Sequence, residues 1–275
     1  MNVISPPQTP PRFAQISRSQ RWLSHAAAGW FVVAMIGQFL FTAYILGLYG
    51  VSAIEGDWEQ WSSVMPHGYT PGDWAGNLSI GIHLLLAAVV NIGGPIQILP
   101  QVRNRWPRFH RYLGRTYIGA GYLISLTGLF LVWVRGSVGG PEGAVSISIN
   151  GLLIMAFATL TIREARAGNF RSHRKWALRL FLVMSGVWFF RVGLMLWLMV
   201  WQAPVGFDPE SFRGPFLTFW GLAQYLLPLA VLEAYFWAQE KSGRWGQWGV
   251  AAMLGVATVA TAAGVLAVSL GMWWG

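Results

Sequence analysis

Long apolar segments alternate with short polar, arginine-rich segments along this chain of 275 residues. A helix that crosses a bilayer needs about 20 mostly apolar residues, because each residue rises about 1.5 Å through about 30 Å of hydrocarbon. The segments that meet this requirement are residues 26–49, 77–99, 116–134, 145–162, 177–201, 215–238 and 248–270. They lack the alternation of a membrane β-barrel, and unpaired backbone is costly in lipid. The pattern therefore predicts an all-α, polytopic transmembrane helical bundle of seven spans.

The spans form one predicted transmembrane domain, residues 26–270, after a polar, proline-rich tail over residues 1–25. The first apolar segment is longer than the 7–15 residues that are typical of a signal-peptide core. It is therefore interpreted as an uncleaved anchor.

Basic residues set the predicted orientation. When the seven spans are threaded through a membrane, 16 of the 19 Lys and Arg residues lie in the segments on one side. Seven of the 10 acids lie in the segments on the other side. Because cytoplasmic loops are enriched in basic residues, the N-terminus is predicted to be cytoplasmic and the C-terminus outside.

Composition removes several classes of function. Only 11% of the residues are charged, against about 25% in soluble domains. The absence of cysteine excludes disulfides, thiolate metal sites, iron–sulfur clusters and a cysteine nucleophile. The net charge of +9 arises at span ends, where basic side chains meet anionic lipid headgroups, so the predicted partner is the bilayer and not a nucleic acid.

Polar residues within predicted spans are the first functional candidates, because they are costly in hydrocarbon. His83, Asn91 and Gln97 lie on one helical stripe of the second span, which is interpreted either as a packing seam or as a site where His83 is a ligand or handles protons. Arg191 lies about 21 Å from the inner end of the fifth span. Arg191, Gln224 and His83 form an outer-half cluster if their spans adjoin, whereas Glu233 is too far away in depth to pair with Arg191.

The two basic loops each place a His-Arg pair before an outward-running span, at His110 and at His173. The alternatives are interfacial anchoring and a weak repeat of residues 77–134 and 145–201 in which the two histidines meet. Neutral imidazoles bind haem or metal ions, so His83, His110 and His173 are the candidate ligands.

A set of residues resembles the motifs of a family of predicted bacterial membrane proteins, catalogued as domain of unknown function 2306. The residues that carry the resemblance are His83, Gly94-Pro95-Ile96-Gln97, Arg103, Arg105, Pro107, His110-Arg111, Gly114-Arg115, Tyr117, His173-Arg174, Trp176, Arg179 and Arg191. The resemblance covers residues 80–195 and implies a multi-pass protein of the bacterial inner membrane. The chain also distantly resembles b561-type haem bundles, but those place two histidine pairs on facing helices, and only His83 lies clearly within hydrocarbon here.

Three functions remain open. The first is a redox-type protein that binds one b-type haem or a quinone between its helices, with His83, Arg191, His110, His173 and Gln224 as candidate cofactor-binding residues. The second is a transporter or proton-coupled permease. The third is a non-catalytic membrane scaffold or assembly partner, in which the polar residues hold helices together and another membrane protein is bound.

Overall fold

The computed structural model describes residues 17–64 and 68–274, and most of these residues are helical. The elements in chain order are α1 (Arg18–Ile45), η1 (Leu46–Gly50), α2 (Val51–Glu55), η2 (Trp58–Ser62), α3 (Trp74–Ile98), α4 (Pro100–Arg105), α5 (Pro107–Val134), α6 (Gly140–Arg166), α7 (Phe170–Met184), α8 (Gly186–Trp201), α9 (Pro215–Glu240), α10 (Arg244–Val268) and η3 (Ser269–Trp273). No strand forms within these two ranges. The prediction of an all-α bundle is confirmed.

Each predicted span coincides with a helix or a continuous run of helices. Six of them, including the run Arg18–Glu55, are long and apolar enough to cross a membrane, and a bent pair of helices supplies a seventh candidate. The protein is therefore a multi-pass membrane protein. The predicted tail over residues 1–25 lies outside the described residues up to residue 16, and from Arg18 onward it is already part of α1.

The predicted fifth span, residues 177–201, is not one straight helix. The chain bends by 53° between α7 and α8. Ser185 lies at the bend, where its hydroxyl donates to the carbonyl of Phe181 at 2.8 Å and accepts from Nε2 of Gln38 at 2.8 Å. A serine that bonds to the preceding turn bends a helix, and the Ser185-Gly186 pair is a typical kink site.

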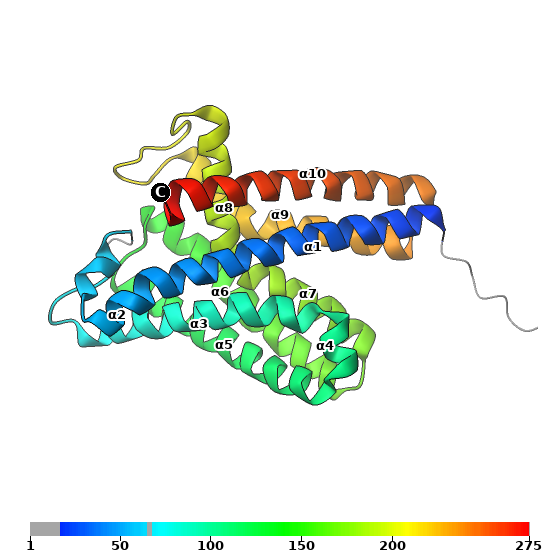
Figure 1. The fold of residues 1–275 in the computed structure, drawn as a ribbon, viewed down its shortest axis with the longest axis horizontal. Helices are drawn as coiled ribbons and strands as arrows, with labels where there is room; N and C mark the ends of the chain where they lie inside the picture. The colour runs from blue at the N-terminus through cyan, green and yellow to red at the C-terminus, as the bar shows by residue number, and fades with distance from the viewer. Residues whose placement is uncertain (1–16, 65–67, 275) are drawn as a thin grey trace, which may run out of the picture.

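The bend decides which helices become neighbours. The α7 half packs mainly against α6, and the α8 half packs against α10 and α9. The first and last spans, α1 and α10, run side by side, and α3, α5 and α6 form the other part of the bundle (Figure 1). Glycine allows close contact here, because a Cβ on Gly264 of α10 would lie 2.6 Å from the carbonyl oxygen of Val192 of α8.

The basic loops all lie at one end of the bundle, at the start of α1, α5 and α7 and between α9 and α10 (Figure 1). The two ends of the described chain lie at opposite ends of the bundle. This arrangement agrees with an odd number of spans, and the assignment of the basic end to the cytoplasm stays a prediction.

Candidate functional site

Arg191 lies on α8 and is partly buried against α1. Its guanidinium carbon is 5.3 Å from the centre of the Phe41 ring, where the negative face of the ring attracts the cation. Tyr44 and Tyr49 are its electrostatic neighbours. Within residues 17–64 and 68–274, Arg191 makes no hydrogen bond or ion pair. Its five N–H donors are therefore available to an oxygen acceptor supplied by water or by a ligand.

Buried polar atoms that lack a hydrogen-bond partner among the described residues lie near Arg191. The Tyr44 hydroxyl and the indole nitrogen of Trp273 are buried and lack a hydrogen bond of ordinary geometry within the described residues, and the hydroxyl of Tyr49 is a polar neighbour of that of Tyr44. The two rings stack at 5.9 Å, and the Phe41 ring lies 5.3 Å from that of Trp273. We call Arg191, Phe41, Tyr44, Tyr49 and Trp273 the Arg191 cluster. Because a buried donor without a partner costs about 1–3 kcal/mol, this cluster has unused capacity to bind an acceptor.

Two of these residues come from π-helical turns. Tyr49 belongs to η1, at the end of the first span, and Trp273 belongs to η3, at the end of the last. A π-helical turn is less stable than an α-helical one and is frequently found at functional sites. Ser269 of η3 also has a buried hydroxyl without a partner among the described residues. Both turns thus contribute polar groups to the Arg191 cluster or its edge.

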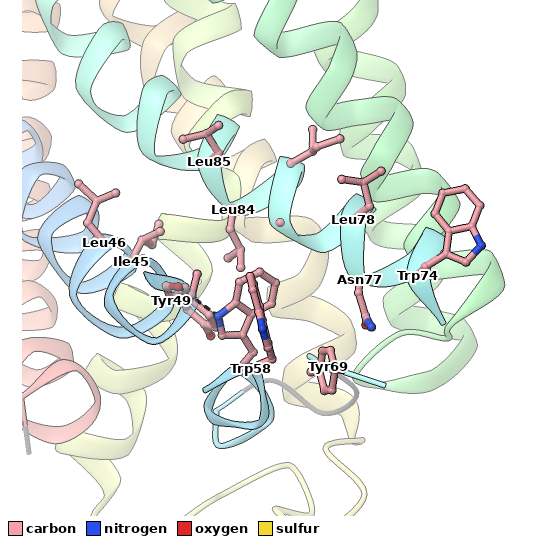
Figure 2. A pocket seen from close by; sticks show the side chains of 15 residues that line it. Ile45, Leu46, Tyr49, Trp58, Tyr69, Trp74, Asn77, Leu78, Leu84 and Leu85 are labelled. Atoms are coloured by element: carbon pink, nitrogen blue, oxygen red, sulfur yellow. Dashed lines mark hydrogen bonds between the residues drawn. The ribbon is translucent and has the colours of Figure 1, made fainter. Parts of the chain in front are cut away.

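A hollow of about 670 Å³ opens beside this cluster, between η1, η2 and α3 (Figure 2). We call it the lateral hollow. It is lined mainly by apolar and aromatic side chains, with Tyr49, Trp58 and Leu84 close together in Figure 2. Leu46, Leu78 and Leu85 on its rim are exposed, as expected of side chains that face acyl chains. Its size lies within the range of about 300–1,000 Å³ that is typical of small-molecule sites.

Tyr49 connects the lateral hollow to the Arg191 cluster. Its side chain lines the hollow, and its ring lies 6.3 Å from that of Tyr44. Its carbonyl accepts a hydrogen bond from the Trp61 indole at 3.1 Å, which holds η2 over the hollow. Of the five residues of the Arg191 cluster, Tyr49 is the one whose side chain lines the lateral hollow, and Tyr49 is also an electrostatic neighbour of the Arg191 guanidinium.

The residues of the predicted outer-half cluster, Arg191, Gln224 and His83, lie on α8, α9 and α3. Within the described ranges, no hydrogen bond or ion pair joins any two of them. Gln224 is buried and donates to the Gly221 carbonyl at 2.7 Å, whereas His83 faces Thr127. The helix that carries Arg191, α8, packs on α10 and on α9, whereas α3, which carries His83, packs on α5 and α1.

His83 lies between α3 and α5. Its Nδ1 is 3.1 Å from the Thr127 hydroxyl, which itself donates to the Leu123 carbonyl at 2.8 Å. The Thr127 oxygen therefore accepts from Nδ1–H, and Nε2 keeps its lone pair. A hydrogen bond of this kind fixes the orientation of metal-binding histidines, although it equally serves helix packing.

His110 and His173 lie close to each other, within electrostatic range, at the basic end. The His173 Nδ1 donates to the Thr161 carbonyl at 2.9 Å, which leaves its Nε2 free of a proton in the neutral ring. The His110 Nδ1 is buried and has no hydrogen-bond partner among the described residues. Gln97 holds this turn of α5 by donating to the His110 carbonyl at 2.8 Å. The structure thus brings these two predicted residues together, and it separates them from His83 and Arg191.

Four carboxylates, those of Asp73, Glu164, Glu233 and Glu240, form ion pairs with cations other than Arg191. Glu233 accepts two hydrogen bonds from Arg179, at 2.7 and 2.9 Å, in agreement with the expectation that it does not pair with Arg191. At the opposite end, Asp73 accepts from Arg135 at 2.7 Å and from the backbone N–H of Gly76 at 2.9 Å. These hydrogen bonds, the Gly76 bond above all, hold the pKa of Asp73 below its ordinary value. No group of three or more His, Cys, Asp or Glu side chains within the described ranges is arranged to hold a metal ion.

Sequence reasoning identified Arg191 but missed its aromatic neighbours. Phe41, Tyr44 and Tyr49 belong to the first span, and the two tyrosine hydroxyls in a long apolar segment were the available signal. The partner Trp273 comes from the other end of the chain. Only the packing of α1 on α10 places these residues around one guanidinium.

Residues 80–209, from α3 to the loop after α8, match the model of a family described as "Predicted membrane protein (DUF2306)". The family recognised from the sequence is therefore confirmed for this region, which contains His83, His110, His173 and Arg191. No curated protein and no solved structure matches the chain. The likeness to b561-type haem bundles stays a prediction.

Proposed function

We propose that this integral membrane protein binds a quinone, with its ring in the lateral hollow and a carbonyl oxygen directed toward the Arg191 cluster. The observation that carries the proposal is a partly buried guanidinium without a hydrogen-bond partner in the described chain, next to an aromatic hollow that faces lipid. A membrane quinone is largely apolar and reaches such a site through the bilayer. Its two carbonyl oxygens are acceptors only.

The chemistry of the cluster supports an acceptor rather than a donor. Arg191 offers only N–H donors, and the indole of Trp273 is also a donor only. The Tyr44 hydroxyl lacks an acceptor among the described residues. A neutral carbonyl oxygen satisfies such groups without bringing a second charge into hydrocarbon, where ionised groups are costly. Aromatic walls at Tyr49, Trp58 and Trp61 suit a planar ring, because offset and edge-to-face contacts between rings are favourable.

Equilibrium binding of decylubiquinone to the detergent-solubilised protein, followed by quenching of tryptophan fluorescence, tests the proposal. Arg191→Gln is expected to weaken binding by about tenfold or more, because hydrogen bonds to charged groups contribute about 1.5–3 kcal/mol. Arg244→Gln is the matched control, because it removes an arginine at the basic end, away from the lateral hollow. Decylbenzene, which has the same tail and no carbonyl, is added as a competitor of decylubiquinone and separates polar recognition from simple partitioning.

The outcomes distinguish the proposal from its alternatives. Displacement of decylubiquinone by an equal concentration of decylbenzene, or equal affinity of the wild type and Arg191→Gln for decylubiquinone, would overturn the quinone site. Loss of folded protein in Arg191→Gln without any quinone binding by the wild type would favour the scaffold function. Flux of a solute in proteoliposomes that depends on Arg191 would favour a transporter.

A b-type haem is the second candidate, and His110 with His173 is the observation that favours it. Each ring has a nitrogen available as a ligand, and the two side chains, on α5 and α7, lie within electrostatic range of each other. Protein purified under mild conditions should then show a Soret band that is lost in His110→Ala and retained in His25→Ala, which lies on α1. A band that persists in His110→Ala would exclude this pair as ligands.

A further inference from the structure

A second hollow lies at the basic end of the bundle, on the first two turns of α5. It has a volume of about 300 Å³ and is lined by Arg108, Arg111, Tyr112 and Arg115. We call it the arginine hollow. The four side chains follow the spacing i, i+3, i+4 and i+7, so they share one helix face. All four are exposed.

The arginines of this hollow are not neutralised by the protein. Like charges at these spacings repel each other and destabilise a helix. Three acids lie at this end of the bundle, and each pairs with a cation of α6 or α7: Glu164 with Arg163, Glu233 with Arg179, and Glu240 with Arg171 and Lys175. Among the described residues, Arg108, Arg111 and Arg115 make no ion pair. The charge of the hollow is therefore available to an external anion.

The surroundings indicate which anion. Trp106, Phe109 and Tyr112 are exposed large aromatic residues on the same segment. Aromatic rings of this kind are enriched where a protein meets lipid headgroups. The α5 helix continues from this point into a membrane-crossing segment. The hollow therefore lies at the level of the headgroups, where phosphate groups carry the negative charge.

We propose that the arginine hollow binds the phosphate group of an anionic membrane lipid, in the leaflet at the basic end of the bundle. Three guanidinium groups can donate several hydrogen bonds to phosphate oxygens, and arginine does so in a bidentate manner that lysine does not match. The exposed aromatic rings contact the glycerol and upper acyl region. Basic sites of this type are known to recognise anionic headgroups.

Native mass spectrometry of the detergent-solubilised protein measures the binding of single lipid molecules and tests the proposal. Phosphatidylglycerol is expected to bind at least about tenfold more tightly than phosphatidylcholine. Removal of the three charges in the R108Q/R111Q/R115Q variant should weaken phosphatidylglycerol binding by about fivefold for each arginine, the size of the attraction of one basic side chain to an anionic membrane surface. Arg111→Lys should bind more weakly than the wild type and more tightly than Arg111→Gln.

The control variant R18Q/R21Q/R244Q removes the same number of charges from the same end of the bundle, outside the hollow. An equal loss in this control would overturn the site, because it would show a general effect of net charge. Equal affinity for the two lipids would overturn it as well. Full displacement of phosphatidylglycerol by millimolar inorganic phosphate would show that the hollow takes free phosphate and not a lipid. If the triple variant does not fold, as judged by circular dichroism, Arg111→Gln alone carries the test.

Discussion

At the scale of single residues, the polar groups around Arg191 show a conflict between stability and binding. Burial of the Tyr44 hydroxyl and the Trp273 indole without partners is unfavourable for the free protein. Such groups persist in a fold when they serve a ligand or a conformational change. This conflict can be tested, because the same atoms that destabilise the ligand-free protein are the ones proposed to bind the ligand.

Tyr44→Phe should separate the two effects. Removal of a hydroxyl that has no partner leaves the ring contacts with Trp273 and Tyr49 in place. The ligand-free variant is therefore expected to unfold at the same temperature as the wild type or at a higher one, while its affinity for decylubiquinone falls by about fivefold to tenfold, the value of one hydrogen bond of about 1–1.5 kcal/mol. Thermal unfolding and fluorescence titration measure the two quantities. A lower unfolding temperature with unchanged affinity would assign the hydroxyl to the fold instead.

Asp73 gives a residue-scale prediction about pH. Its folded pKa is lowered, so its ionised form is favoured in the folded protein by the Gly76 N–H and by Arg135. The stabilisation is complete above the ordinary carboxyl pKa of about 3.9 and is lost as the pH falls through the lower folded value. The difference in unfolding temperature between the wild type and Asp73→Asn should therefore be constant near neutral pH and shrink below about pH 4. Asp57→Asn, which removes an exposed carboxylate from the preceding segment, should cause a smaller change at neutral pH.

Single residues also show which parts of the candidate sites could be predicted from the sequence alone. Arg191, His110 and His173 stand out because charged or imidazole side chains are unusual in or beside apolar segments. Their partners do not stand out, because Phe41 and Trp273 are ordinary residues of membrane helices. Residue type shows which groups need a partner. Only helix packing determines which partner each group receives.

At the scale of the helices, hydrophobicity predicted where each span lies but not how it is shaped. The length of an apolar segment is fixed by the thickness of the bilayer, so span positions follow directly from composition. The Ser185-Gly186 pair is a local signal for a kink, but the hydrogen bond that Gln38 of α1 donates to Ser185 at this bend cannot be read from any local pattern. Pro95, a residue that commonly breaks helices, lies inside the continuous helix α3. The adjacent Gly94 packs closely against Phe181 and Tyr117 of other helices, a contact that the sequence alone does not show.

Close packing of α8 on α10 gives the prediction that belongs to this scale. Gly264→Ala places a Cβ 2.6 Å from the Val192 carbonyl oxygen, so the two helices must separate. Overpacking of this kind costs about 1–3 kcal/mol, which should appear as a lower midpoint in thermal or denaturant unfolding. Gly255→Ala is the control on the same helix, because a Cβ there meets nothing within 4 Å and alanine favours a helix. Equal effects of the two substitutions would show that this contact does not limit the approach of the helices.

At the scale of the whole molecule, the two proposed sites lie on different helices of one bundle. The Arg191 cluster lies between α1, α8 and η3, and the arginine hollow lies on the first turns of α5. Arg191 lies ten residues before the end of α8, roughly 15 Å along the helix axis from that end. Their separation means that a variant in one site should leave ligand binding at the other unchanged, and this allows each proposal to be tested alone.

The orientation of the bundle is the prediction for the molecule as a whole. The absence of cysteine makes single introduced cysteines specific reporters. Glu210→Cys lies in the loop between α8 and α9, and Gly243→Cys lies between α9 and α10 at the basic end, where a Cβ meets nothing within 4 Å. Because basic loops stay in the cytoplasm, a membrane-impermeant maleimide should label Glu210→Cys in intact cells and Gly243→Cys only after permeabilisation. The reverse pattern would place the arginine hollow in the outer leaflet, and labelling of both positions in intact cells would mean that α9 does not cross the membrane.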